Sequence, residues 1–309
     1  MDLRFIGPVY LGWTLGASYA ANIFGAAVSS YMIRYRTAVI LAGIFLVIGA
    51  LTNGQAGIKT LSGLTEQTGN TAFIISLAAA LTVNLMIILR LPVSTSQAVV
   101  GPIIGIGIIN KQLQLQGLTK IFICWFTTPI GAGIIAIIFY WSMTKIFKKV
   151  NIHFLLYDKI MRNLLILAGI YGAYTLGGNN VANVTGVFYK SKIFNMKQAL
   201  LIGGISTGLG ALFNGKKMMT AVGGEIIKID AFSAFIAIMS HSIAIHIYNK
   251  IGVPVSSSQA IVGALTGIGV LRGIKTISLE KVAKIFAGWF FTPAIGMCFC
   301  LILYKIFLG

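Results

Sequence analysis

Two closely similar peptides place polar side chains inside apolar stretches of the chain: LPVSTSQAVVG over residues 91–101 and VPVSSSQAIVG over residues 253–263. In each, a proline suited to the first turn of a helix precedes a serine suited to the N-cap, with a glutamine three residues further on. The pattern predicts a helix that starts inside an apolar layer. Its free N–H groups and positive dipole end would face an anion.

Hydroxyl side chains next to the two caps would add donors to such an anion site. The alternative interpretation is a pair of ordinary proline-kinked helices whose serine and threonine side chains bond back to the backbone. Two copies at equivalent places favour a site over that alternative. The hydroxyl candidates are Thr95, Ser96, Ser257 and Ser258, behind the caps Ser94 and Ser256 and the glutamines Gln97 and Gln259.

A second pair of peptides, over residues 16–25 and 177–186, sets asparagines among glycines and alanines. Small residues let helices approach closely, so packing alone explains part of this pattern. Amides inside an apolar layer need partners, and they can donate to an oxyanion or accept at a cation. The candidates here are Asn22, Asn179, Asn180 and Asn183.

The remaining polar residues give weaker indications. His241 and His246 are interpreted first as core histidines, with a role in ion coupling left to test. Residues 214–230, with their lysines and acidic groups, are interpreted as a solvated loop. The three cysteines, Cys124, Cys298 and Cys300, lie in apolar runs and are interpreted as core residues. No catalytic motif is present, so an enzyme is not expected, and neither is a cofactor.

The elements that must position these residues come from a duplicated unit. The asparagine peptides, the Asn-Gly pairs at 53–54 and 214–215, the Pro-Val-Ser peptides and two Trp-Phe-x-Thr-Pro peptides recur in one order at a near-constant offset. We expect a first transmembrane repeat over residues 1–150 and a second over residues 151–309. A short basic cytoplasmic connector near residues 145–162 would join them.

Composition sets the class of protein. The chain has 309 residues, of which 57% are hydrophobic and 10% charged, as expected for an integral membrane protein. The net charge is +18, and the basic residues that produce it lie between apolar segments. This placement is typical of topogenic charge at helix ends and not of nucleic-acid binding. With the N-terminus outside, a modest majority of the basic residues falls on the cytoplasmic side.

The predicted fold is an all-α polytopic membrane protein with about ten hydrophobic segments in two inverted repeats and broken, proline-led helices at the centre. An odd number of segments in each half makes the second half enter the membrane upside down. The expected segments are residues 5–30, 37–57, 71–90, 93–109 and 119–145, then 162–188, 197–213, 231–249, 255–270 and 281–307.

With these motifs assembled, the chain resembles the inorganic phosphate transporter (PiT) family over nearly its whole length, with a sulfate-permease-like member as a variant. That family carries a repeated Gly-Ala-Asn-Asp-Val-Ala-Asn-type signature, matched here by residues 177–186, and a Gly-Lys-Lys-Val-Met-like segment, matched by residues 215–220. The resemblance implies a permease coupled to sodium or protons, with Asn22 and Asn183 as sodium contacts. The implied anion contacts are Asn22, Thr95, Ser96, Gln97, Asn179, Asn180, Asn183, Ser257, Ser258 and Gln259.

The chain departs from the family signature at its carboxylates. Tyr19 and Asn180 stand where the family has aspartates, and Ser18 stands where it has the first asparagine. A carboxylate can bind a cation or accept a proton from a protonated phosphate. Sulfate has no proton to donate, so these replacements fit sulfate at least as well as phosphate.

We therefore predict a multi-pass cell-membrane protein that carries inorganic phosphate by cation-coupled symport with alternating access. A sulfate permease of the same fold is the alternative, and a passive anion channel or a non-transporting receptor or scaffold comes after it. The expected partners are inorganic phosphate or sulfate, the lipid bilayer and a second copy of the chain in a homodimer, and no nucleic acid.

Overall fold

The computed structural model describes residues 5–89, 93–150, 153–225, 230–273 and 279–309, and the side chains at 87, 154–155, 214–225 and 279–285 fall outside this description. The secondary structure in the described residues consists of eleven helices and no strands. They are α1 (Ile6–Ser29), α2 (Tyr35–Asn53), α3 (Gln55–Ser62), α4 (Gly69–Ile88), α5 (Thr95–Ile109), α6 (Leu115–Val150), α7 (Phe154–Lys190), α8 (Met196–Glu225), α9 (Ala231–Ile251), α10 (Ser257–Arg272) and α11 (Leu279–Phe307).

Seven of these helices are long and apolar enough to cross a membrane: α2, α4, α6, α7, α8, α9 and α11. The prediction of an all-α, multi-pass membrane protein is confirmed. Helices α5 and α10 have 15 and 16 residues. They are therefore shorter than the roughly 20 residues that a bilayer span requires.

Two local expectations are wrong. Of the expected loop at 214–230, residues 214–225 continue helix α8, and residues 226–229 lie outside the described residues. The expected segment 37–57 is interrupted at Gly54, where α2 ends and the short α3 begins. Backbone hydrogen bonding accounts for both differences from the expected segments. A helix in an apolar layer pairs its N–H and C=O groups internally, so it ends only where a break in that pairing is tolerated.

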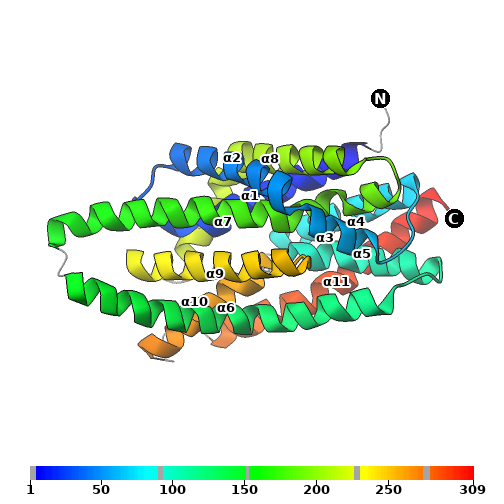
Figure 1. Cartoon of the computed structure of the whole chain (residues 1–309). Helices are drawn as coiled ribbons and strands as arrows, with labels where there is room; N and C mark the ends of the chain where they lie inside the picture. The colour runs from blue at the N-terminus through cyan, green and yellow to red at the C-terminus, as the bar shows by residue number, and fades with distance from the viewer. Residues whose placement is uncertain (1–4, 90–92, 151–152, 226–229, 274–278) are drawn as a thin grey trace.

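Helix α7 lies at the centre of the bundle. Figure 1 shows it between α2 and α8 on one side and α9 and α6 on the other, with the long helices running roughly along one direction. The broken helix of each half packs against the last long helix of the other half, α5 against α11 and α10 against α6. Residues far apart in the sequence therefore meet around α7.

Local chemistry sets where the broken helices start. Ser94 and Ser256 are the N-caps of α5 and α10, as predicted, and each side chain accepts a hydrogen bond from the backbone N–H of the glutamine three residues on, at 3.4 and 3.3 Å. Before α10, Gly252 ends α9 in the left-handed conformation (φ 79°), and Pro254 follows two residues later. This is a common way to end a helix. Pro92, the equivalent proline before α5, lies outside the described residues.

The far end of α10 is held by an ion pair. Arg272 donates to Asp230, the residue that caps the start of α9, and both contact Ser233. Burial alone would raise the pKa of the Asp230 carboxyl, but the Ser233 hydrogen bonds and the Arg272 guanidinium hold that pKa below its usual range. The ion pair therefore ties α10 to α9 through a charged carboxylate.

Close helix contacts give a first prediction. A methyl group at Gly101 of α5 would meet the carbonyl of Pro293 in α11, and one at Gly263 of α10 would meet the carbonyl of Pro129 in α6. We expect Gly101→Ala and Gly263→Ala each to lower the free energy of unfolding by about 1–3 kcal/mol, because two helix backbones must separate. Equilibrium unfolding in mixed detergent micelles measures this.

The matched control is Gly105→Ala on α5, where the nearest atom, Cγ of Met297, would lie 3.4 Å from the added methyl carbon. That distance allows ordinary contact, so we expect little change in stability. Equal losses for Gly101→Ala and Gly105→Ala would contradict the predicted close approach.

Candidate functional site

Two adjacent asparagines on α7 contact the starts of both broken helices. The Asn179 amide closes a ring with the backbone of Val255, donating to its carbonyl at 2.8 Å and accepting from its N–H at 2.9 Å. The Asn180 side-chain oxygen accepts from the hydroxyl of Thr95, the first residue of α5, at 3.2 Å. One turn of α7 therefore brings the beginnings of α5 and α10 into one region.

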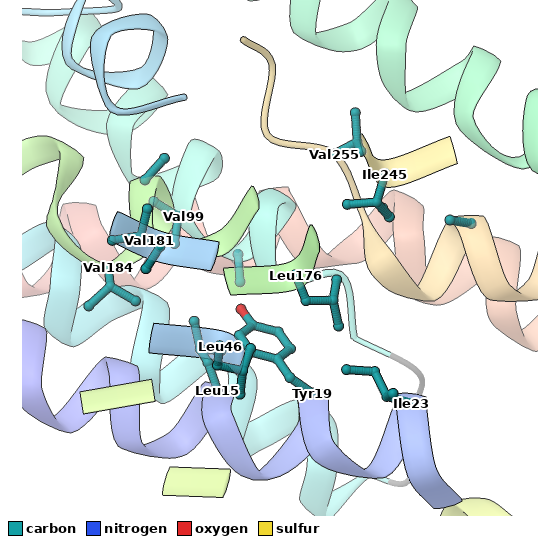
Figure 2. Packing of buried hydrophobic residues seen from close by; sticks show 14 of the residues in the cluster. Leu15, Tyr19, Ile23, Leu46, Val99, Leu176, Val181, Val184, Ile245 and Val255 are labelled. Carbon is teal, nitrogen blue, oxygen red and sulfur yellow. The ribbon is translucent and has the colours of Figure 1, made fainter. Parts of the chain in front are cut away.

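Asn180 is the centre of a small buried network. Its oxygen also accepts from the Asn183 amide at 3.0 Å, and its own amide nitrogen donates to the carbonyl of Leu176 at 3.0 Å. The Tyr19 hydroxyl from α1 lies beside Thr95 and Asn183 and is hydrogen-bonded to neither. Figure 2 shows this tyrosine rising from α1 with its hydroxyl directed toward α7.

Several buried polar atoms in this region have no hydrogen-bond partner. They are the hydroxyls of Ser18 and Tyr19, the side-chain oxygens of Gln97 and Gln259, and the Asn183 side-chain oxygen. Buried polar groups are normally paired, and each unpaired one costs about 1–3 kcal/mol. Other unpaired buried atoms of the described residues lie on α2, α4, α6, α9 and α11, but these five belong to the helices that carry the candidate residues, α1, α5, α7 and α10, and are open to a polar ligand.

The serines of the two Pro-Val-Ser peptides are arranged alike. Ser94 and Ser96 hydroxyls lie 3.5 Å apart, and Ser256 and Ser258 hydroxyls lie 2.9 Å apart. Ser94, Ser96 and Ser256 are fully buried. The hydroxyl pair at the start of α5 is therefore buried, whereas the pair at the start of α10 is half-buried at Ser258, and each pair lies next to the backbone N–H groups that favour an oxyanion.

Of the ten anion contacts expected from the sequence, hydrogen bonds join three into one network, and the role of the set as a site stays a prediction. Thr95, Asn180 and Asn183 form the network, while Asn179 is occupied with the Val255 backbone and so positions α10. Asn22 is half-buried on α1, and no contact places it in the network. Ser96, Gln97, Ser257, Ser258 and Gln259 lie in the first turn of α5 or α10.

One contact was not predicted from the sequence. The Nε2 atom of His241 on α9 lies 3.0 Å from the Ser257 hydroxyl, and both residues are buried. Sixteen residues and a helix break separate them, so no periodicity in the sequence connects the two. The only signal available was a histidine in an apolar run.

The helices define a multi-pass membrane protein, and a buried network of hydroxyl and amide side chains lies inside it. The model of the phosphate transporter family matches residues 15–300, and the chain belongs to that family. The resemblance to inorganic phosphate transporters is thereby confirmed, and this is a family of transporters and not of enzymes.

Some relatives are named for phosphate and another is named for sulfate. A protein of Methanocaldococcus jannaschii, named as a predicted phosphate permease, is 32% identical over 96% of this chain and 94% of its own length. The sulfate permease CysP of Bacillus subtilis is 27% identical over 97% of this chain and 86% of its own length. A solved structure described as the sodium-dependent phosphate transporter superposes with a TM-score of 0.87 over 98% of both chains at 20% identity, which establishes the shared fold.

The ring between Asn179 and Val255 gives a second prediction. Asn179→Ala leaves a buried N–H and a buried carbonyl unpaired, and each group costs roughly 1–3 kcal/mol. We expect a large loss of stability in detergent-micelle unfolding and weaker binding of phosphate or sulfate, because the start of α10 is released.

Asn84→Ala serves as the control. Asn84 is an asparagine on α4 whose amide bonds the Tyr10 hydroxyl at a more exposed place. A loss for Asn84→Ala as large as that for Asn179→Ala would show that removing any intramembrane amide has this effect.

Proposed function

We propose that this protein is a secondary active transporter of inorganic phosphate, working by cation-coupled symport with alternating access. The observation that carries the proposal is the pair of capped helix starts, α5 and α10, brought to one turn of α7 by Asn180 and Asn179. Backbone N–H groups and helix dipoles at these starts favour an anion. Membership of the phosphate transporter family supports phosphate as the first substrate.

The alternating-access mechanism in this proposal depends on two inverted repeats, residues 1–150 and 151–309, which join near residues 145–162. Equivalent contacts in the two halves support the repeats. Gly49 of α2 approaches the Tyr174 carbonyl of α7, and Gly210 of α8 approaches the Trp13 carbonyl of α1 in the same way. An interface shared by two similar halves can rock between two equivalent arrangements, which is how inverted-repeat transporters expose a central site to each side in turn.

Coupling to a cation belongs to the same proposal. The buried, unpaired Asn183 oxygen is a suitable sodium contact, and Asn22 on α1 is the equivalent residue of the other half. Hard cations such as sodium prefer oxygen ligands of this kind. The solved neighbour described as sodium-dependent supports testing sodium first. A homodimer stays a prediction.

Sulfate is the second candidate substrate, favoured by the residues at positions 19 and 180. Tyr19 and Asn180 replace the carboxylates that could accept a proton from phosphate, and neither needs a protonated ligand. A relative named as a sulfate permease aligns over nearly the whole chain.

Uptake into proteoliposomes provides the third prediction. We expect radiolabelled phosphate or sulfate to accumulate when a sodium or proton gradient is imposed. Ser96→Ala combined with Ser258→Ala should reduce the apparent anion affinity by about tenfold or more, since a hydrogen bond to a charged group contributes roughly 1.5–3 kcal/mol.

Other results would select other functions. Flux that no cation gradient drives uphill would identify a passive anion channel. Unchanged anion binding in the double serine variant would favour a receptor or scaffold. Absence of movement of either anion under every gradient would refute the proposal for both substrates.

A restored carboxylate gives the fourth prediction. Asn180→Asp would place a negative charge beside Thr95 and Asn183. We expect sulfate uptake to fall about tenfold or more through like-charge repulsion, and phosphate uptake to fall less, because protonated phosphate can donate a hydrogen bond to the carboxylate. Asn110→Asp, at the exposed end of α5, adds the same charge away from the site and should change neither. Equal losses for both anions in Asn180→Asp would contradict this explanation.

A further inference from the structure

His241 touches the start of α10 from a helix that the anion site does not otherwise use. It lies in the middle of α9, is 1% exposed, and its Nε2 is 3.0 Å from the hydroxyl of Ser257, which is 3% exposed. Ser257 is the first residue of α10. An imidazole therefore contacts a hydroxyl that we have placed among the anion ligands.

The charged groups around α9 lie away from His241. Helix α9 packs against α6, α7 and α10, with fewer contacts to α1 and α3. At its start lies the ion pair with α10, and at its end lie basic residues of α6 and of α9 itself. The ion pair and the lysine hydrogen bonds at these ends do not include His241, whose side-chain partner is Ser257. The charged groups at the two ends include Asp230 and Arg272 at the start, with Asp158 of α7 nearby, and Lys120 and Lys250 at the end.

The uncharged titratable groups nearby are engaged elsewhere. Tyr171 and Tyr174 of α7 lie against His246, with ring centroids 5.7 and 6.3 Å apart from it. The Tyr19 hydroxyl of α1 lies beside Thr95. The part of α6 that faces the middle of α9, residues 128–138, holds no titratable residue. Within the described residues, His241 is thus the titratable group that bonds a first-turn hydroxyl of α5 or α10.

We propose that His241 is the proton-binding site through which this chain couples anion movement to a proton gradient, in place of the family carboxylates at positions 19 and 180. The proposal rests on the transport function proposed above and names its coupling ion. A buried imidazolium is disfavoured without an anion and favoured beside one. Proton and anion therefore bind together, and each raises the affinity of the site for the other.

The contact with Ser257 provides a direct route for this coupling. In the neutral ring protonated on Nδ1, Nε2 is an acceptor, so the Ser257 hydroxyl donates to it and is withheld from an anion. In the imidazolium both nitrogens donate, so Nε2–H donates to the Ser257 oxygen and releases the hydroxyl proton toward the anion. A proton taken up from one side thus creates an anion donor at the start of α10, and its release on the other side withdraws that donor.

His241→Gln separates hydrogen bonding from titration, because glutamine can bond Ser257 but cannot take up a proton near neutral pH. The full-length protein is reconstituted with sulfate as the probe, since sulfate keeps its charge across neutral pH whereas phosphate does not. The membrane potential is clamped and sodium is absent. With an inside-alkaline gradient of one pH unit, one coupled proton supports accumulation of up to about tenfold.

We expect the wild-type protein to accumulate sulfate under this gradient and its apparent sulfate affinity to fall as the pH rises through the histidine range. In His241→Gln we expect loss of accumulation and a flat pH profile, while sulfate–sulfate exchange at equal pH persists. Exchange reports a folded carrier, so lost accumulation with retained exchange separates coupling from structure. His241→Asn is assayed in parallel in case glutamine does not fit the site.

His246→Gln is the matched control, because this residue lies on the same helix, stacks on Tyr171 and does not contact Ser257. It should accumulate sulfate like the wild type. Accumulation by His241→Gln at the wild-type level would overturn the proposal. Wild-type accumulation driven by sodium but not by protons would overturn it too, while leaving the transport function intact. A wild-type protein that neither exchanges nor accumulates phosphate or sulfate would refute the transport function itself.

Discussion

The site depends on the adjacent amides of Asn179 and Asn180 and on the helix that carries them. A helix start inside an apolar layer leaves N–H groups without water, so it requires caps and something to hold the incoming chain. Ser94 and Ser256 provide the caps. Asn179 holds the chain entering α10, and Asn180 holds the first residue of α5. Because both amides lie on one turn of α7, both helix starts are positioned by one rigid element.

The same arrangement explains why unpaired polar atoms are tolerated here. Gln97, Gln259 and Asn183 each have a buried side-chain oxygen without a partner, on helices that pack against several neighbours. Such atoms are destabilising in a purely structural core. In the proposed transport cycle a polar ligand would pair with them during part of the cycle. Tyr19, in place of a carboxylate, adds a hydroxyl and no charge, which shifts the expected coupling chemistry to another group.

Much of the fold could be predicted from residue order alone. The capped starts of α5 and α10 follow from Pro, Ser and Gln spacing, because capping involves atoms within one turn. The long apolar helices follow from hydropathy. The continuation of α8 through residues 214–225 was missed, because lysines and glycines in that stretch are also typical of loops. The equivalence of the two halves was visible in the repeated peptides. Their inverted arrangement in space belongs to the proposed function.

The sequence by itself determined the class of protein, the broken helices and the set of polar residues available for a site, since these depend on local bonding and on burial of apolar side chains. The tertiary structure alone decided which polar atoms meet. Asn180 reaches Thr95, Asn179 closes on Val255 and His241 contacts Ser257 because α7 and α9 pack against the two broken helices. Those contacts join residues with no regular spacing, so only the packing of whole helices brings them together.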